Sequence, residues 1–191
     1  MKDALFRHIN RFISVGEEEF VGMASFFEER EFKKKENLLE KGEVCRANYF
    51  VVRGCLRLFF INEKGAEQTV QFAMEDWWLA DYSSFSSQTA SGFFIQAVEK
   101  TTVFAISYAK QEKLLAKFPQ LERYFRLLHQ RAHAASQSRV MGLFALSREE
   151  AYYRFAERYP DFVNRVPQYL LASFLGFTPE YLSEIRGKKR S

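Results

Sequence analysis

The feature that most constrains this fold is a run of short, strand-like segments separated by turns. Between residue 31 and about residue 107, apolar and β-branched side chains come in short runs and not at helical spacing. The predicted strands cover residues 32–35, 37–40, 47–53, 56–61, 69–72, 93–98 and 102–106. A hairpin signal from Asn62 to Gly65 lies in the middle of the run. Many short strands at this spacing are typical of an antiparallel sandwich or barrel.

Helical patterns flank the predicted strands. Residues 4–13 and 17–27 each place apolar side chains on one face, which predicts two amphipathic helices. A long pattern runs from Gln120 to about Leu146, and it has apolar or small residues at alternating steps of four and three. The residues of this heptad seam are Leu121, Phe125, Leu128, Ala132 and Ala135. Such a helix either packs on its own domain or pairs with a second copy as a homodimer.

The segment from residue 164 to 191 predicts a helix-turn-helix. Pro167 suits the start of a first helix, Gly176 suits a sharp helix end, and Thr178 before Pro179 suits a new N-terminus. Leu182 and Ile185 then face the first helix. The outward residues, which are the DNA-binding candidates, are Thr178, Glu180, Tyr181, Ser183, Glu184 and Arg186, followed by Lys188, Lys189 and Arg190. Such a second helix enters the DNA major groove, although a plain packed helical hairpin has the same pattern.

Charge is distributed unevenly along the chain. Residues 1–119 hold 16 basic and 17 acidic side chains, and residues 120–191 hold 12 basic and 7 acidic ones. The positive charge therefore lies with the predicted DNA reader, as double-stranded DNA requires. Two cysteines, no apolar run of membrane-spanning length and no signal peptide together predict a reduced, cytoplasmic setting without a membrane partner.

The order of these segments resembles that of the Crp/Fnr family of bacterial transcription regulators. Gly42, Tyr49, Gly54 and Gly65 occupy the places of the family's turn glycines and of its Tyr-x-Val-x-x-Gly strand. The resemblance implies an α+β fold with an N-terminal double-stranded β-helix or jelly-roll sensor over residues 1–118. A long dimerisation helix follows over residues 119–146, and a small helix-turn-helix domain, without an evident wing, over residues 147–191. It also implies a homodimeric DNA-binding regulator under allosteric control.

The resemblance fails at the phosphate-binding cassette. The place of the family's Gly-Glu pair reads Ala80 and Asp81, and its arginine place falls near Ser91. No Lys or Arg occurs between Lys64 and Lys100, which argues against cyclic AMP or cyclic GMP as the ligand. The residues predicted to form an effector pocket are Phe72, Trp77, Trp78, Ala80, Asp81, Tyr82, Ser83, Phe85, Ser91 and Phe93. These aromatic side chains either fill the core or wall a site for an apolar or uncharged small molecule.

Other classes of function have little support in the sequence. His129 and His133 stand four residues apart on the long helix, but no third metal ligand is evident. The predicted strands contain no His, which argues against a cupin-type enzyme. We therefore expect no catalytic site, no metal and no cofactor. The alternative to a DNA-binding regulator is a sensor or scaffold that has lost DNA binding and acts on a protein partner. The carboxylate of Glu184 on the predicted recognition helix supports this alternative.

Overall fold

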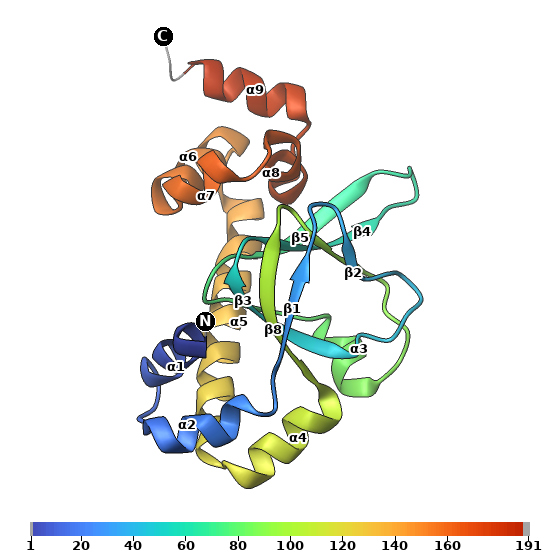
Figure 1. Ribbon diagram of the computed structural model, residues 1–191. Helices are drawn as coiled ribbons and strands as arrows, with labels where there is room; N and C mark the ends of the chain where they lie inside the picture. Colours follow the sequence, from blue (N-terminus) through green and yellow to red (C-terminus); the bar gives the residue numbers. More distant parts are fainter. Residues whose placement is uncertain (1, 189–191) are drawn as a thin grey trace. The chain divides into compact units, whose positions relative to one another are not determined.

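The computed structural model describes residues 2–188 of the 191-residue chain (Figure 1). The chain separates into two compact units. The first consists of residues up to 60 together with residues 70–129, and the second of residues 61–69 together with those from 130 onward. The long helix α5 (Gln120–Ala145) is shared between them. Over the described residues, no helix has the length and apolarity needed to cross a membrane.

Two four-stranded antiparallel sheets form the roll. The strands are β1 (Glu28–Phe32), β2 (Asn37–Leu39), β3 (Ala47–Arg53), β4 (Leu56–Ile61), β5 (Glu67–Ala73), β6 (Trp78–Leu79), β7 (Phe94–Ala97) and β8 (Thr101–Ser107). One sheet has the order β1-β8-β3-β6 and the other the order β2-β7-β4-β5. The predicted antiparallel roll is confirmed, and side chains from both sheets fill its interior.

Glycine is required at the turn between β3 and β4. Gly54 has a φ of 107°, in the left-handed region that favours glycine. A β-carbon there would lie 2.5 Å from the Thr101 hydroxyl oxygen and 2.7 Å from the Lys100 carbonyl oxygen. Both the backbone conformation and the close approach of the neighbouring strand therefore exclude a side chain at this position.

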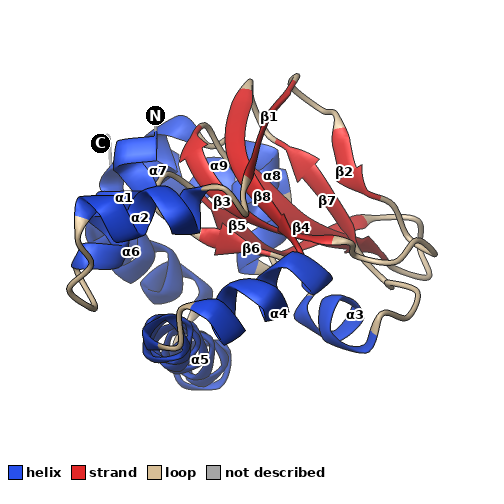
Figure 2. Ribbon diagram, turned by 60° about the horizontal axis from the view of Figure 1, so that its bottom comes forward, coloured by secondary structure: helices blue, strands red, loops and turns tan. Residues whose placement is uncertain are grey.

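Helices pack on the outside of the roll and form a second core (Figure 2). The helices of this core are α1 (Lys2–Asn10), α2 (Glu17–Ala24) and α4 (Tyr108–Lys117), together with the first part of α5. The short helix α3 (Tyr82–Ser87) instead packs Phe85 into the roll interior. Phe50 and Trp78 from the strands meet Tyr124 from α5 in this core. The Trp78 indole N–H donates to the Tyr124 hydroxyl at 2.8 Å, and that hydroxyl lies 2.8 Å from His8 Nδ1. Burial of the phenol raises the pKa of Tyr124 above its usual range, so its hydroxyl stays protonated.

Several elements differ from the predicted ones. The helices α3, α4 and α7 (Pro160–Arg165) and the short strand β6 are not predicted from the sequence, and the first strand covers Glu28–Phe32 rather than the predicted residues 32–35. Most β1 side chains are charged and exposed, so no apolar alternation marks this strand. It forms because its backbone pairs with β8, from Glu28 opposite Ala105 to Phe32 opposite Thr101. Pairing with a distant strand therefore makes this segment a strand, although its own sequence has no strand-like pattern.

Within the described part of the second unit, four helices follow α5. They are α6 (Arg148–Arg158), α7 (Pro160–Arg165), α8 (Gln168–Leu175) and α9 (Pro179–Lys188). The predicted capping box is confirmed, because Ser147 and Glu150 exchange hydrogen bonds at the start of α6. The buried side chains that hold these helices together are Tyr152, Phe162, Val163, Val166, Leu170, Leu171, Ala172, Leu182 and Ile185.

Candidate functional site

The helices α8 and α9 and the turn between them form the predicted helix-turn-helix. Gly176 ends α8 with φ 75° and ψ 30°, and its amide donates to the carbonyls of Ala172 and Ser173. Only glycine adopts this conformation without strain. Thr178 then accepts a hydrogen bond from the Tyr181 amide at 3.2 Å, as an N-cap residue does. The predicted glycine turn and N-cap are therefore confirmed.

The inner face of α9 is anchored in the helical core of the second unit. Leu182 and Ile185 are fully buried, which confirms their predicted orientation. The Tyr153 hydroxyl of α6 donates to the Ile185 carbonyl at 3.2 Å. Tyr181 packs against Phe177 with ring centroids 5.7 Å apart, and the Arg148 guanidinium lies 5.8 Å from the Tyr181 ring centre. These contacts fix which side of α9 faces solvent.

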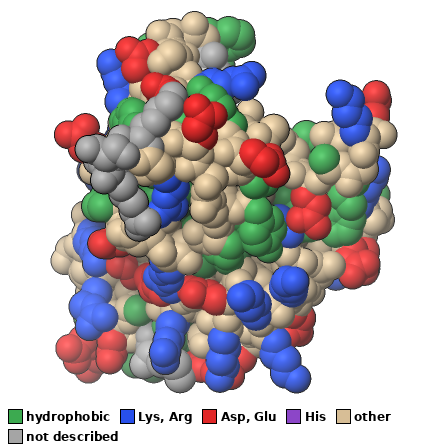
Figure 3. Space-filling model, turned by 90° about the horizontal axis from the view of Figure 1, so that it is seen from above, with side chains coloured by type: hydrophobic (Ala, Val, Ile, Leu, Met, Phe, Trp, Pro, Cys, Tyr) green, Lys and Arg blue, Asp and Glu red, His purple; other side chains and the backbone are tan. Residues whose placement is uncertain are grey.

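The outward face of α9 carries most of the predicted DNA-binding side chains. Thr178, Glu180, Ser183 and Glu184 are exposed, whereas Tyr181 and Arg186 are half-buried. Lys188 is the last residue of α9, and Lys189 and Arg190 lie outside the described residues. Basic and acidic side chains are interspersed over the face shown in Figure 3.

The outer end of the β4–β5 hairpin is hydrogen-bonded to α8, a contact that the sequence does not predict. This end, called the hairpin tip below, contributes Glu67, Gln68 and Thr69 from the start of β5. The Ser173 hydroxyl accepts from the Thr69 amide at 2.9 Å and donates to the Glu67 carbonyl at 2.8 Å. The Gln68 side-chain amide also donates to the Ser173 carbonyl. Three bonds thus converge on one serine of the first helix of the helix-turn-helix.

In the stretch that matches the phosphate-binding cassette, the Asp81 carboxylate forms hydrogen bonds with neighbouring residues of the same stretch. Asp81 is buried and caps α3, where it accepts from the amides of Ser83 and Ser84 at 3.1 and 3.3 Å. Its other oxygen accepts from the Ser91 hydroxyl at 2.7 Å. The Ser84 hydroxyl in turn accepts from the Cys45 amide at 2.9 Å. The Asp81 carboxylate therefore occupies the amides and the hydroxyl that could otherwise donate hydrogen bonds to a bound anion.

Most of the aromatic side chains of the predicted effector pocket are buried or half-buried. Phe72, Trp78 and Phe85 are buried, with Phe85 in the interior of the roll and Trp78 in the second core. Trp77 is 45% exposed to solvent, and Phe93 packs on the roll interior. Tyr82 stacks edge-on against His129 at 4.8 Å between ring centroids, and burial raises the pKa of its hydroxyl. These positions fit the alternative in which the aromatic side chains pack in the core, and a role in an effector site stays a prediction.

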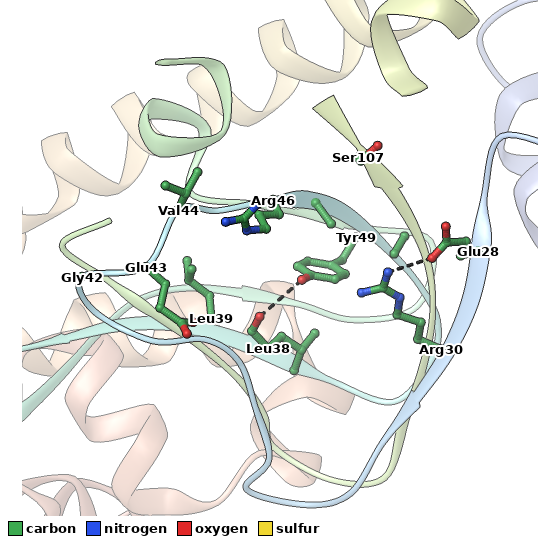
Figure 4. Close-up of a pocket in the computed structure, with 12 residues that line it drawn as sticks. Glu28, Arg30, Leu38, Leu39, Gly42, Glu43, Val44, Arg46, Tyr49 and Ser107 are labelled. Carbon is green, nitrogen blue, oxygen red and sulfur yellow. Dashed lines mark hydrogen bonds and ion pairs between the residues drawn. The ribbon is translucent and has the colours of Figure 1, made fainter. Parts of the chain in front are cut away.

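A cavity of about 670 Å³ lies elsewhere in the roll (Figure 4). Its lining comes from β1, β2, β3, β8 and the loop before β3. The lining residues are Glu28, Arg30, Leu38, Leu39, Gly42, Glu43, Val44, Arg46, Ala47, Tyr49, Ala105 and Ser107. None of them belongs to the predicted pocket. The segments that form the cavity are far apart in sequence, so no local motif points to it.

The predicted dimer seam on α5 divides into a buried and an exposed part. Leu121 and Phe125 are only 1% and 7% exposed and pack within their own protomer, which corrects their assignment to a dimer interface. Leu128 is half-buried against the same core. Residues 131–138, which include Ala132 and Ala135, are all exposed. Phe144, farther along the helix, is 88% exposed, so the second half of α5 presents an apolar surface.

The described residues contain no cluster of three or more His, Cys, Asp or Glu side chains that could hold a metal ion. Both cysteines are buried thiols, and burial raises the pKa of Cys45. Burial also lowers the pKa of His129, which packs on Tyr82. Packing therefore explains the positions of these side chains.

Comparison with known families identifies the first unit. Residues 29–118 match the family described as the cyclic nucleotide-binding domain. The roll has the fold of this domain family. At the place of the phosphate-binding cassette, however, the chain has no arginine. No curated protein matches the chain.

Solved structures of regulators share the fold over most of the chain. FixK2 from Bradyrhizobium japonicum is 17% identical with a TM-score of 0.70, and the match covers 85% of this chain and 83% of FixK2. The catabolite activator protein of Thermus thermophilus is 23% identical with a TM-score of 0.57, over 93% and 84% of the two chains. The c-di-GMP-responsive regulator CLP of Xanthomonas campestris is 12% identical with a TM-score of 0.67, over 89% and 91%. The predicted resemblance to the Crp/Fnr family is thus confirmed in fold.

Proposed function

We propose that this chain is a homodimeric, DNA-binding transcription regulator whose cyclic nucleotide-binding domain responds to a signal other than cyclic AMP or cyclic GMP. The observation that carries the proposal is the helix α9. It follows a glycine turn and a threonine cap, buries Leu182 and Ile185, and leaves Glu180 and Glu184 exposed. A helix held in this way is suited to enter the major groove.

In this proposal, base contacts come from the N-terminal part of α9. The Glu180 carboxylate accepts from a cytosine amino group, and Arg186 reaches a guanine or a phosphate. Lys188, Lys189 and Arg190 would contact phosphates, which position the protein but carry no sequence information. Recognition thus depends on few charges, in keeping with the mixed charges in Figure 3.

Dimerisation would use the exposed second half of α5. The small side chains of Ala132 and Ala135 let two helices approach closely, and Phe144 adds apolar area beyond them. A two-fold dimer would place two copies of α9 in successive major grooves about 34 Å apart, which predicts an inverted-repeat operator.

Signal transfer would pass through the β4–β5 hairpin. Its tip is bonded to Ser173 on α8, and its strands continue into the roll that contains the cavity. A ligand that binds one state of the roll more tightly than the other then shifts the population of DNA-binding conformers.

The proposal is tested by fluorescence anisotropy with a labelled duplex of random sequence at several salt concentrations. We expect log K to fall linearly with log salt, because binding releases counterions from the phosphates. Arg186→Gln should weaken binding, whereas Arg53→Gln on the exposed end of β3 should not. Absence of salt-dependent binding would favour the protein-partner alternative.

A further inference from the structure

We propose that the 670 Å³ cavity of the roll binds a monoanionic organic carboxylate with an apolar body, with Arg46 as the group that receives the carboxylate. This inference rests on the proposed function only for its consequence, since such a ligand would be the effector of the regulator. The binding itself requires neither DNA nor a dimer.

The size and the walls of the cavity suit a small organic molecule. Ligand sites in proteins span roughly 300–1,000 Å³ and combine apolar walls with a few polar groups. Here the apolar walls come from several elements of the roll: Leu38, Leu39, Val44, Ala47 and Ala105. An apolar body is therefore needed to replace the water that these side chains would otherwise contact.

One carboxylate of the lining is already neutralised. Glu28 forms ion pairs with Arg30 at 2.7 Å and with Lys110 at 2.6 Å. These two cations lower the pKa of Glu28 to about 2, with Lys110 the larger cause. The Glu28 carboxylate is thus paired with two cations, of which Arg30 also lines the cavity.

The second carboxylate is also engaged. Glu43 accepts a hydrogen bond from the Glu40 amide at 3.1 Å within the turn before β3. Arg46, by contrast, forms no hydrogen bond or ion pair with any residue that the structure describes. In Figure 4 its side chain lies at the cavity beside Tyr49, on the other side of that ring from Arg30. Arg46 is exposed to solvent, so its uncommitted guanidinium is accessible to a ligand that enters the cavity beside the apolar wall.

A single uncommitted guanidinium matches a single negative charge. Its planar fork binds a carboxylate through two parallel hydrogen bonds. A dianionic phosphate would bring a second charge that no free cation of the lining balances. The Tyr49 hydroxyl donates to the Leu38 carbonyl at 3.4 Å, and burial raises the pKa of Tyr49 to about 12. The phenol thus stays neutral and does not repel an anion.

The experiment compares octanoate with octanamide, which keeps the apolar body but removes the charge. Binding to the full chain without DNA is followed by the amide resonances of Arg46 and Tyr49 and by the Tm. We expect octanoate to bind and to raise the Tm by mass action. Arg46→Gln should weaken octanoate about 10- to 100-fold, because a hydrogen bond to a charged group contributes about 1.5–3 kcal/mol. Arg46→Lys should retain part of the affinity.

Arg53→Gln is the matched control, since this exposed arginine of β3 does not line the cavity. The inference is wrong if octanoate leaves the Arg46 and Tyr49 resonances unchanged at millimolar concentration. It is equally wrong if octanamide binds as tightly as octanoate, or if Arg46→Gln and Arg53→Gln behave alike. If the chain binds octanoate but no DNA, this inference holds and the proposed function is wrong. If the chain binds DNA but not octanoate, the proposed function holds and this inference is wrong.

Discussion

At the scale of single residues, Asp81 is the side chain that we expect to oppose a cyclic nucleotide at the place of the phosphate-binding cassette. Its carboxylate takes up two amides of α3 and the hydroxyl of Ser91. A cyclic phosphate brought to this place would meet a buried negative charge and no arginine, because no Lys or Arg occurs between Lys64 and Lys100. No cationic side chain of this stretch would then offset the free energy that the phosphate loses when it leaves water.

We therefore predict that cyclic AMP and cyclic GMP do not bind at micromolar concentration. Isothermal titration calorimetry of the full chain measures this directly, and it should record only the heat of dilution for both nucleotides. The variant Asp81→Asn serves as a comparison, since it removes the repelling charge without supplying a cation. A micromolar Kd for either nucleotide with the wild-type chain would show that the cassette works without its arginine.

A second prediction concerns Glu28 and pH. Its folded-state pKa, about 2, lies below its ordinary value of 4.5, so its stabilising effect is full above pH 4.5. That effect is lost as the pH falls through about 2. The urea midpoints of wild type and Glu28→Gln should differ at pH 6 and converge between pH 4.5 and 2. The difference should be small and should shrink in salt, because the pair is exposed.

Glu29→Gln is the matched control for this series, because Glu29 forms no ion pair among the described residues. Its midpoint should follow the wild type across the pH range. A Glu28→Gln difference that persists unchanged at pH 2 would rule out the ion pairs with Arg30 and Lys110 as its cause.

At the scale of elements, the hairpin tip and α8 form the contact that we expect to link the roll to the DNA-binding helices. Ser173→Ala removes the hydroxyl that accepts from the buried Thr69 amide and donates to Glu67. A buried amide without a partner costs about 1–3 kcal/mol. Hydrogen exchange at the Thr69 amide should accelerate in this variant, and the unfolding midpoint should fall.

Ser183→Ala, on the exposed side of α9, should leave both measurements at the wild-type values. Unchanged protection of Thr69 in Ser173→Ala would mean that the hairpin tip does not rest on α8 in solution.

The second half of α5 is the element on which the dimer depends. Ala132→Glu would bury a charge in the seam of a dimer, at a cost of several kcal/mol if the charge is unpaired. Sedimentation velocity should show a dimer for wild type and a monomer for the variant. Gln137→Glu, off the seam but on the same exposed stretch, should remain dimeric. A wild-type monomer, or an Ala132→Glu dimer, would contradict this interface.

Sequence patterns predict some elements of this fold closely and others not at all. The bounds of β3 and β4 are predicted because their apolar runs end where Gly54 imposes a turn. The helix-turn-helix is predicted because its cap and its glycine act locally. The helices α3 and α4 are not predicted, although each begins at a local N-cap, Asp81 and Ser107 respectively. The strand β1 forms through its pairing with β8. The bond between the hairpin tip and Ser173 joins residues more than 100 positions apart, so no local pattern reveals it.

The candidate sites follow the same division. The outward face of α9 could be read from helical spacing alone, once Leu182 and Ile185 were placed inside. The cavity could not be predicted from the sequence, because its lining residues come together only when the two sheets pack against each other. The aromatic side chains suggested a pocket from composition, but aromatic residues fill a core equally well. The first half of the α5 seam was misassigned for the same reason, since a heptad does not tell which partner buries it.

At the scale of the whole molecule, the account predicts a regulator that reads DNA as a symmetric pair of helices. Glu180 is the residue that sets base preference in this account, because an exposed carboxylate near the start of α9 can accept from cytosine. Glu180→Ala should relax the preference at one base pair of each half-site, with a loss of about 1–3 kcal/mol for the preferred base. Glu157→Ala, an exposed glutamate of α6, should keep the wild-type preference.

The most direct test is selection of bound duplexes from a random pool with the wild-type chain, repeated with Glu180→Ala. The account predicts an enriched inverted repeat whose half-site centres lie about 10 base pairs, one helical turn, apart. It also predicts that Glu180→Ala enriches a repeat with one position degenerate in each half. Recovery of no enriched repeat, together with binding to bulk DNA that is absent or insensitive to salt, would contradict the assignment of α9 as a DNA reader.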